Sequence, residues 1–149
     1  MATVRDLIPE DAPAVTALYA EYEWWADREV ADVRAALAET DVAVGVDVDG
    51  HLVAAARVLT DFRYYANLFD VVVAESHRGE GLGERLVRAV VEHPALESVV
   101  GVSLLCRRGL VPFYESVGFE YFDPETEIPE GGTEELVRMT YEMPDDGGR

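Results

Sequence analysis

The sequence contains no lysine, so arginine supplies its permanent positive side chains. It contains one cysteine, Cys106, which excludes an internal disulfide and favours a reducing compartment, the cytoplasm. No apolar run has membrane-spanning length and the N-terminus does not resemble a signal peptide, so we expect no membrane association. The histidines, His51, His77 and His93, are scattered, and with a single cysteine they predict no metal site.

Positive charge is also scarce, because 12 arginines face 30 acids and leave a net charge of −18. The acids are spread along the chain, which argues against an acidic tail. Attraction of cationic substrates is one explanation. Adaptation to high salt (a halophilic chain) is another, which we favour, since the Debye length falls to about 3 Å at 1 M salt and self-repulsion is screened. No nucleic-acid partner is expected.

What the sequence does contain indicates an ordinary folded domain. Its 149 residues are 49% hydrophobic, enough for a sizeable core and too apolar for a disordered chain. We expect a single domain over residues 1–143 and a flexible tail over 144–149.

The most informative stretch changes from strand to helix within a few residues. Residues 70–74 form a short, β-branched apolar run, typical of a buried strand. A polar break follows, and apolar residues then recur at helical spacing over 82–90, before Pro94. Three glycines, Gly79, Gly81 and Gly83, crowd the junction.

This junction predicts a phosphate site, because the first helical N–H groups lack partners and carry partial positive charge. Glycines let a ligand approach those groups, and Arg78 adds a full charge. A P-loop is excluded, since it requires a lysine, and a dinucleotide fingerprint would need its third glycine one residue later. A plain glycine-rich connection remains the alternative.

Two motifs carry a family resemblance. The pattern Arg78-x-x-Gly81-x-Gly83 resembles the acyl-CoA pyrophosphate loop of the Gcn5-related N-acetyltransferase (GNAT) family. A later stretch ending in Tyr114-Glu-Ser-Val-Gly-Phe119 resembles a second motif of that family, and its residues are especially similar to those of the arylalkylamine-type members. The motifs occur in the family's order, which is more specific than either alone.

The order of elements predicts an α+β fold. The resemblance implies the GNAT acyl-CoA N-acyltransferase fold, a mixed, mostly antiparallel sheet of about six to seven strands flanked by about four helices. In that fold two neighbouring strands splay apart and their free backbone groups pair with the pantetheine arm of CoA. The predicted strands are 3–7, 42–48, 51–60, 70–74, 99–105, one beginning at 118–119 and 137–143; the predicted helices are 9–25, one after Asp27, 82–90 and 109–116.

The resemblance implies transfer of an acetyl group from acetyl-CoA, as cosubstrate, to a primary amine by direct attack in a ternary complex. Tyr114 stands at the family's general-acid position, and a phenol, with a reference pKa of about 10, is protonated at neutral pH. The alternative is a core aromatic. Glu75 and Asp70 are the acids nearest the reacting strand and are both candidates for the base, with neither assigned firmly.

The remaining site residues follow from the same resemblance. Arg107 stands where many family members have an asparagine, and it is either a further CoA contact or a solvated surface residue. The expected CoA-binding residues are Val71, Val72, Val73, Arg78, Gly79, Glu80, Gly81, Leu82, Gly83 and Arg107. The expected substrate contacts are Trp24, Trp25 and Tyr65.

Several functional alternatives remain open from the sequence. The favoured acceptor is a small-molecule amine. A protein or peptide N-acetyltransferase, which needs an open groove, is a second reading, and a CoA-binding regulatory domain without turnover is a third. Homodimers are common in the family through late strands, and residues 137–143 are a candidate edge.

Overall fold

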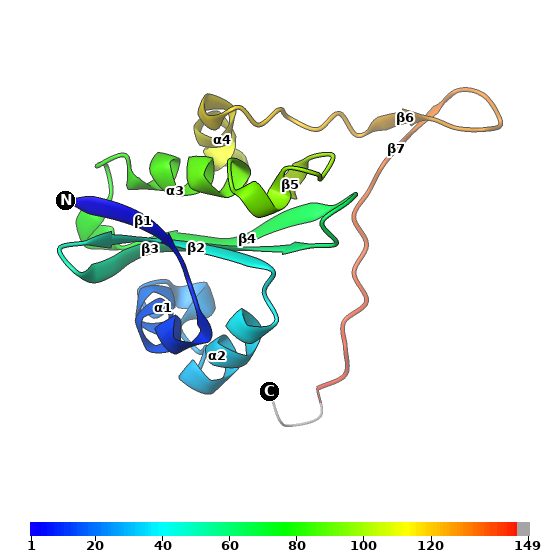
Figure 1. The fold of residues 1–149 in the computed structure, drawn as a ribbon. Helices are drawn as coiled ribbons and strands as arrows, with labels where there is room; N and C mark the ends of the chain where they lie inside the picture. Colours follow the sequence, from blue (N-terminus) through cyan, green and yellow to red (C-terminus); the bar gives the residue numbers. More distant parts are fainter. Residues whose placement is uncertain (146–149) are drawn as a thin grey trace.

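The computed structural model describes residues 1–145 and shows a sheet between two layers of helices (Figure 1). The sheet has five strands in the order β1-β2-β3-β4-β5, antiparallel except for the β4–β5 pair, which is parallel. The strands are β1 (Ala2–Asp6), β2 (Val42–Val48), β3 (His51–Thr60), β4 (Ala66–Val73) and β5 (Val102–Leu104).

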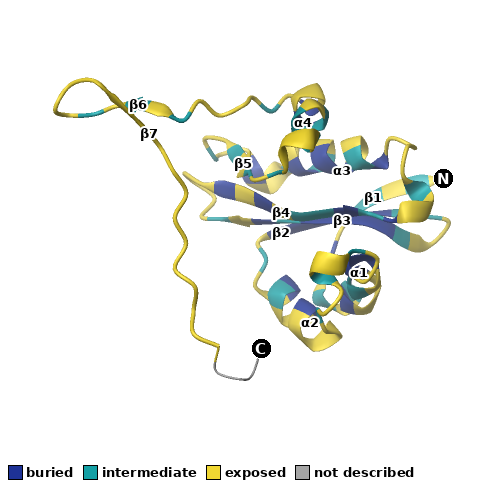
Figure 2. Ribbon diagram, turned by 180° about the vertical axis from the view of Figure 1, so that it is seen from behind, coloured by how far each residue is buried: buried dark blue, intermediate teal, exposed yellow. Residues whose placement is uncertain are grey.

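Four α-helices cover the two faces of the sheet. Helices α1 (Ala12–Tyr19) and α2 (Val30–Ala38) lie on one face, and α3 (Leu82–Val91) and α4 (Val111–Val117) lie on the other (Figure 1). Burial follows this layering, with the dark core running along the strands and the inner helix faces (Figure 2). The largest fully buried side chains come from these elements: Leu86, Val15, Val44, Val46, Val58, Val87 and Val90.

The β2–β3 hairpin confirms the sequence prediction, with both strands at the predicted bounds. Its turn residues, Asp49 and Gly50, have φ values of 50° and 82°. Positive φ at both positions is what a two-residue hairpin turn requires, and aspartate and glycine tolerate it best.

Strand β4 has two irregular features that matter for the site. Its pairing with β5 covers Ala66 to Leu68 only, so the strand continues from Phe69 to Val73 without a neighbour on that side. Its register with β3 also shifts near Asp70, whose φ is 56°. After Leu68, β4 and β5 therefore diverge, and the backbone groups of β4 on the β5 side have no partner in a neighbouring strand.

The N-terminal helical region differs from the prediction of one helix over residues 9–25. The structure has a 3₁₀ turn at Pro9–Asp11, helix α1, and a second 3₁₀ turn at Glu23–Trp25. The helix ends because Tyr22 is extended (φ −122°, ψ 128°), and its hydroxyl donates a hydrogen bond to the carbonyl of Val73 at 2.6 Å. A tertiary contact thus overrides the helical periodicity.

The C-terminal predictions were wrong in position. Gly118 caps α4 with φ 117°, and neither residues 118–119 nor 137–143 form a strand in the chain. Instead β6 (Glu125–Glu127) and β7 (Thr133–Glu135) pair as a separate two-stranded hairpin. The hairpin projects away from the domain (Figure 1).

The main sheet therefore has five strands rather than six or seven, and β6 and β7 form their own ribbon. Of the predicted tail, 144–149, residues 146–149 lie outside the described residues. No helix within residues 1–145 is both long enough and apolar enough to span a membrane.

Candidate active site

A cavity of about 870 Å³ lies where β4 ends and α3 begins. Five segments distant in sequence meet there: the turn after α1, the end of β4, the glycine turn, the approach to α4, and α4 itself. The lining residues are Glu21, Tyr22, Glu23, Trp24, Trp25, Val71, Val73, Glu75, His77, Arg78, Gly79, Gly81, Leu82, Gly83, Glu84, Arg107, Leu110, Phe113 and Tyr114.

The glycine turn brings open backbone to the cavity. Gly79 and Gly81 have φ values of 77° and 78°, and a Cβ atom on either would meet no atom within 4 Å. Gly81 is the N-cap of α3, so the N–H groups of the first helical turn have no intrahelical acceptor and face the turn. The combination of free N–H groups, a helix dipole and no side chains suits a pyrophosphate.

Gly83 lies in different surroundings from the other two glycines. It lies inside α3, and a Cβ there would lie 3.4 Å from Cζ of Phe113 and 3.6 Å from Cγ2 of Val73. These are ordinary contact distances, so a Cβ atom would fit at Gly83, against Phe113 of α4 and Val73 of β4.

Tyr22 covers the free edge of β4. Its hydroxyl donates to the Val73 carbonyl at 2.6 Å and accepts from Nε of Arg78 at 3.2 Å and from Nη2 of the same residue. The Arg78 guanidinium carbon also lies 5.0 Å from the centre of the Tyr22 ring. Arg78 is thereby held at the cavity by a phenol, and its charge remains half exposed.

Tyr114 closes the inner end of the cavity. It is buried, and its ring packs edge-on against Phe113 and Phe119, with ring centres 4.9 and 5.7 Å away. Burial, with a smaller contribution from Cys106, raises the pKa of Tyr114 to about 12. The phenol is therefore protonated throughout the physiological range, as a proton donor must be.

The two candidate bases are separated by the structure. Glu75 lines the cavity, and its backbone N–H donates to Oε1 of Glu21 at 2.8 Å. Asp70 does not line the cavity. Its carboxylate is one-tenth exposed and accepts from Nη1 of Arg28 at 3.0 Å and Nε of Arg57 at 2.7 Å.

The other predicted residues divide in the same way. Trp24, Trp25 and Arg107 line the cavity together with most of the glycine-loop residues. Val72 points into the core, and Glu80 is outside the lining. Tyr65 is 72% exposed and does not line the cavity.

Sequence reasoning missed some lining residues, notably Glu21, Glu23, Leu110 and Phe113. The first two lie in what was predicted to be continuous helix, where the turn that exposes them has no proline or glycine signal. Phe113 is the residue before Tyr114 in the second motif, and its ring lies beside Gly83 of the first motif, where an added Cβ would meet it at 3.4 Å.

The family model for the acetyltransferase (GNAT) family matches residues 2–119. This covers both motifs, the whole five-stranded sheet and all four α-helices. The chain therefore belongs to the acetyltransferase (GNAT) family. The α+β fold and the family resemblance predicted from the sequence are confirmed.

Individual relatives agree with this assignment. The chain is 35% identical over 74 residues to GCN5-related N-acetyltransferase 2, chloroplastic, of Arabidopsis thaliana, covering 50% of this chain and 28% of that protein. It is 38% identical over 76 residues to glucosamine 6-phosphate N-acetyltransferase 1 of rice (Oryza sativa subsp. japonica), covering 47% and 46% of the two chains. The chain thus spans less than half the length of these two relatives.

A solved structure matches over most of its length. The crystal structure of a protein from Xanthomonas campestris pv. campestris, assigned to the GNAT family, superposes with a TM-score of 0.67 at 31% identity. The match covers 80% of this chain and 85% of that one.

The site's own features fit the family's cosubstrate, acetyl-CoA. The open glycine turn and the two arginines of the lining, Arg78 and Arg107, suit its phosphates. The unpaired edge of β4 beyond Leu68 suits the amide groups of its pantetheine arm, which would replace Tyr22 at the Val73 carbonyl.

Proposed function

We propose that this protein transfers an acetyl group from acetyl-CoA to a primary amine of a small molecule, by direct attack in a ternary complex. One observation carries the proposal: a single cavity unites the glycine turn of α3, the open edge of β4 and the buried phenol of Tyr114. These are, respectively, a phosphate site, a track for an amide-bearing chain and a proton donor.

In the proposed reaction the neutral amine nitrogen attacks the thioester carbonyl carbon. Negative charge develops on the carbonyl oxygen, and backbone N–H groups of β4 around Val72 and Val73 stabilise it. The C–N bond forms, the C–S bond breaks, and Tyr114 gives its proton to the leaving sulfur. Glu75 takes the amine proton, directly or through water, because it lines the cavity and Asp70 does not.

The charges around the cavity favour a cationic acceptor. Four lining carboxylates, Glu21, Glu23, Glu75 and Glu84, face only two lining arginines. If both arginines engage CoA phosphates, the remaining field attracts an ammonium group and repels a phosphorylated acceptor. The proposed substrate is therefore an amine without phosphate groups, unlike the sugar phosphate named for the rice relative.

We further propose that the chain works as a homodimer in the cytoplasm of an organism adapted to high salt. The lone thiol of Cys106 supports the compartment. The net charge of −18 without lysine supports the salt adaptation, because self-repulsion of this size is weakened by screening.

The decisive experiment is a calorimetric titration with acetyl-CoA at low and at molar salt, followed by turnover with a panel of small amines and peptides. We expect saturable one-to-one binding, and turnover that favours cationic small amines. Absence of binding in both buffers would reduce the glycine turn to a simple connection, and turnover of peptides alone would replace the small-molecule proposal.

The role of Tyr114 is tested by Tyr114→Phe. We expect kcat to fall by about 10²- to 10⁴-fold, with the Kd for acetyl-CoA unchanged, because only the proton is lost. The matched control is Tyr19→Phe: Tyr19 is buried, burial also raises its pKa to about 12, and it does not line the cavity. An equal fall in both variants, or no fall in Tyr114→Phe, would remove the general-acid assignment.

A further inference from the structure

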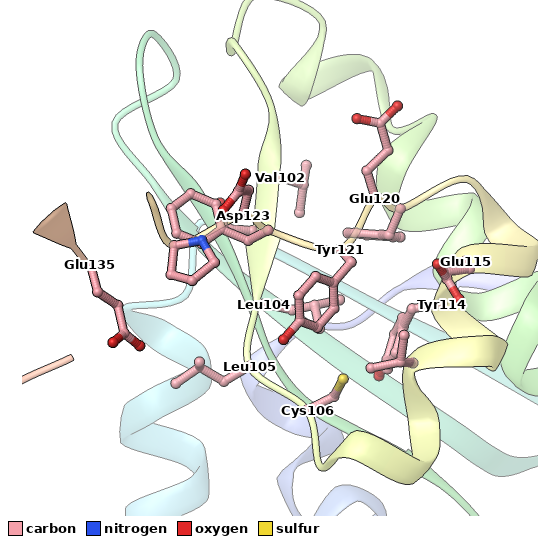
Figure 3. Close-up of a pocket in the computed structure, with 15 residues that line it drawn as sticks. Val102, Leu104, Leu105, Cys106, Tyr114, Glu115, Glu120, Tyr121, Asp123 and Glu135 are labelled. Atoms are coloured by element: carbon pink, nitrogen blue, oxygen red, sulfur yellow. The ribbon is translucent and has the colours of Figure 1, made fainter. Parts of the chain in front are cut away.

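One side of the cavity at the glycine turn is aromatic. The rings of Tyr22, Trp24 and Trp25 contact one another there, with ring centres 5.3, 5.9 and 5.6 Å apart. Tyr114, by contrast, also lines a second cavity, of about 950 Å³, between β5, α4 and the segment after α4 (Figure 3). None of the three rings lines that second cavity, so they belong to the cavity at the glycine turn alone. We call these three residues the aromatic wall.

The aromatic wall already holds cations from the chain itself. The guanidinium carbon of Arg78 lies 5.0 Å from the centre of the Tyr22 ring. That of Arg28 lies 5.5 Å from the centre of the Trp25 ring. No arginine within residues 1–145 lies over the ring of Trp24, which is 66% exposed. Because cations are attracted to ring faces, and most strongly to tryptophan, the wall has room for one more cation at Trp24.

An unpaired carboxylate stands beside the aromatic wall. Glu21 and Glu23 come from the same turn and both line the cavity. Glu21 accepts the N–H of Glu75 at 2.8 Å, whereas the side chain of Glu23 has no hydrogen-bond or ion-pair partner among residues 1–145. Glu84 lines the cavity too, but it is paired with Arg88 at 2.9 Å. The negative charge available to a ligand therefore lies next to the open ring of the wall.

CoA gives Arg78 a better partner than Tyr22. In the structure Nε of Arg78 donates to the Tyr22 hydroxyl at 3.2 Å, and that hydroxyl donates to the Val73 carbonyl. A pyrophosphate at the glycine turn presents an oppositely charged acceptor in place of a neutral phenol, and arginine forms its strongest hydrogen bonds with such anions. We expect Arg78 to turn toward the phosphate and to uncover the face of the Tyr22 ring.

We propose that the acceptor amine carries a second cationic group, which binds on the aromatic wall where the Arg78 guanidinium lies in the structure. This rests on the proposed acetyl transfer and narrows the acceptor to an aliphatic diamine or polyamine. One amine loses its proton to Glu75 and attacks the thioester. The other remains protonated against Tyr22 and Trp24, with Glu23 as its counter-ion. CoA raises the affinity for such an acceptor, because it draws away the arginine that competes for the wall.

The first test is calorimetric titration with putrescine, an aliphatic diamine, and with n-butylamine as the matched monoamine. Both are titrated into the free protein and into its complex with CoA, which has no acetyl group to transfer. We expect CoA to tighten putrescine binding at one site by about tenfold or more. We also expect the CoA complex to bind putrescine about tenfold or more tightly than n-butylamine. Equal affinities for the two amines, or no tightening by CoA, would overturn the proposal.

The second test needs no CoA. Arg78→Ala uncovers the face of Tyr22 permanently, so we expect the free variant to bind putrescine about tenfold more tightly than the free native protein does. The matched control is Arg107→Ala, which removes the same charge from the same cavity at a residue that lies over no ring. An equal gain in both variants, or no gain in Arg78→Ala, would overturn the assignment of the cation site.

The third test locates the bound cation by adding a second substitution to Arg78→Ala. Trp24→Leu or Glu23→Gln should abolish the gain in putrescine affinity, and both variants should fold because both side chains are exposed. Glu84→Gln is the control, since it removes the same charge from the same cavity at a carboxylate already paired with Arg88, and it should retain the gain. A gain that survives Trp24→Leu and Glu23→Gln would place the cation elsewhere and overturn the proposal.

The results are separable from those for the proposed activity. Absence of acetyl-CoA binding would remove the transferase role, while the second and third tests would still report on the cation site, because they measure putrescine affinity alone. Conversely, acetyl transfer to n-butylamine with the same kcat/KM as to putrescine would retain the activity and overturn the second cationic group.

Discussion

The domain up to Gly118 and the segment from Phe119 to Asp145 contrast sharply in how their apolar side chains are buried. Every buried apolar side chain among residues 1–145 lies at or before Val117, and none lies after it. The family match ends at almost the same place, residue 119. The second segment nevertheless contains Tyr121, Phe122 and the alternating apolar residues of 137–143.

The difference teaches that apolar composition does not define a core without neighbours to pack against. Up to Gly118, each strand has a partner and each helix has a sheet beneath it. From Phe119 on, the chain offers only the β6–β7 hairpin, and an isolated two-stranded hairpin has little stability of its own. Stability therefore resides in the first part.

The largest effect should come from the centre of the first part. Leu86→Ala, in α3, removes a fully buried side chain and leaves a cavity between the helix and the sheet. We expect a loss of about 3 to 5 kcal/mol in the free energy of unfolding, measured by denaturant titration. A loss below about 1 kcal/mol would mean that the domain is loosely packed there, which would weaken the comparison.

The next effect concerns the Asp70 ion pairs. Asp70→Asn retains a residue that tolerates positive φ but removes the charge shared by Arg28 and Arg57, so we expect about 2 kcal/mol of destabilisation by denaturant titration. The control, Asp49→Asn, has similar φ (50°) at an exposed turn and should cost little. Retained kcat in Asp70→Asn would place this carboxylate in the framework, and a loss of turnover without loss of stability would restore it as a candidate base.

A smaller effect should depend on pH. The Arg5 guanidinium donates to both carboxylate oxygens of Asp11, at 3.0 and 2.9 Å, and so lowers the pKa of Asp11. A lowered folded-state pKa contributes stability above the unfolded value of about 3.9, and this contribution is lost as the pH falls through the folded value.

Asp11→Asn should therefore cost about 1 kcal/mol near pH 7 and almost nothing at the acid end, measured as the difference between thermal unfolding curves. High salt should reduce the difference at pH 7 because the pair is partly exposed. A difference that is constant with pH would contradict the ion-pair explanation.

The smallest effect is expected at Met139→Ala, in the exposed stretch after β7. We expect a change within about 0.5 kcal/mol in the free energy of unfolding, measured by thermal unfolding, because the side chain is 88% exposed. A loss above about 1 kcal/mol would show that this stretch packs on the domain, which would weaken the comparison.

Regular patterns made much of the fold predictable. The alternation of β2, the Asp49-Gly50 turn and the helical spacing of α3 each depend on neighbouring residues, so the sequence alone specified them. The end of α1 depends instead on a hydrogen bond between Tyr22 and Val73, far apart in the chain. The segment 137–143 has the alternating pattern of a strand, but within residues 1–145 no neighbouring strand pairs with it. An alternating pattern does not by itself show whether such a neighbour exists.

The site was predictable to the same degree. The glycines were found from their position between a strand and a helix, and Tyr114 from the family resemblance; they line one cavity in the structure. The choice between Glu75 and Asp70 was not predictable. It depends on the irregular backbone of β4 at Asp70 and on two arginines distant in sequence, Arg28 just before α2 and Arg57 in β3. The catalytic roles of the site residues remain predictions.

The position of the Tyr114 ring, as a shared wall of two cavities, has a thermodynamic consequence. A shift of the ring when a ligand enters one cavity alters the wall of the other. Binding in the two cavities is then linked, and linkage is reciprocal: the factor by which a ligand in one cavity changes the affinity of the other cavity is the same in both directions.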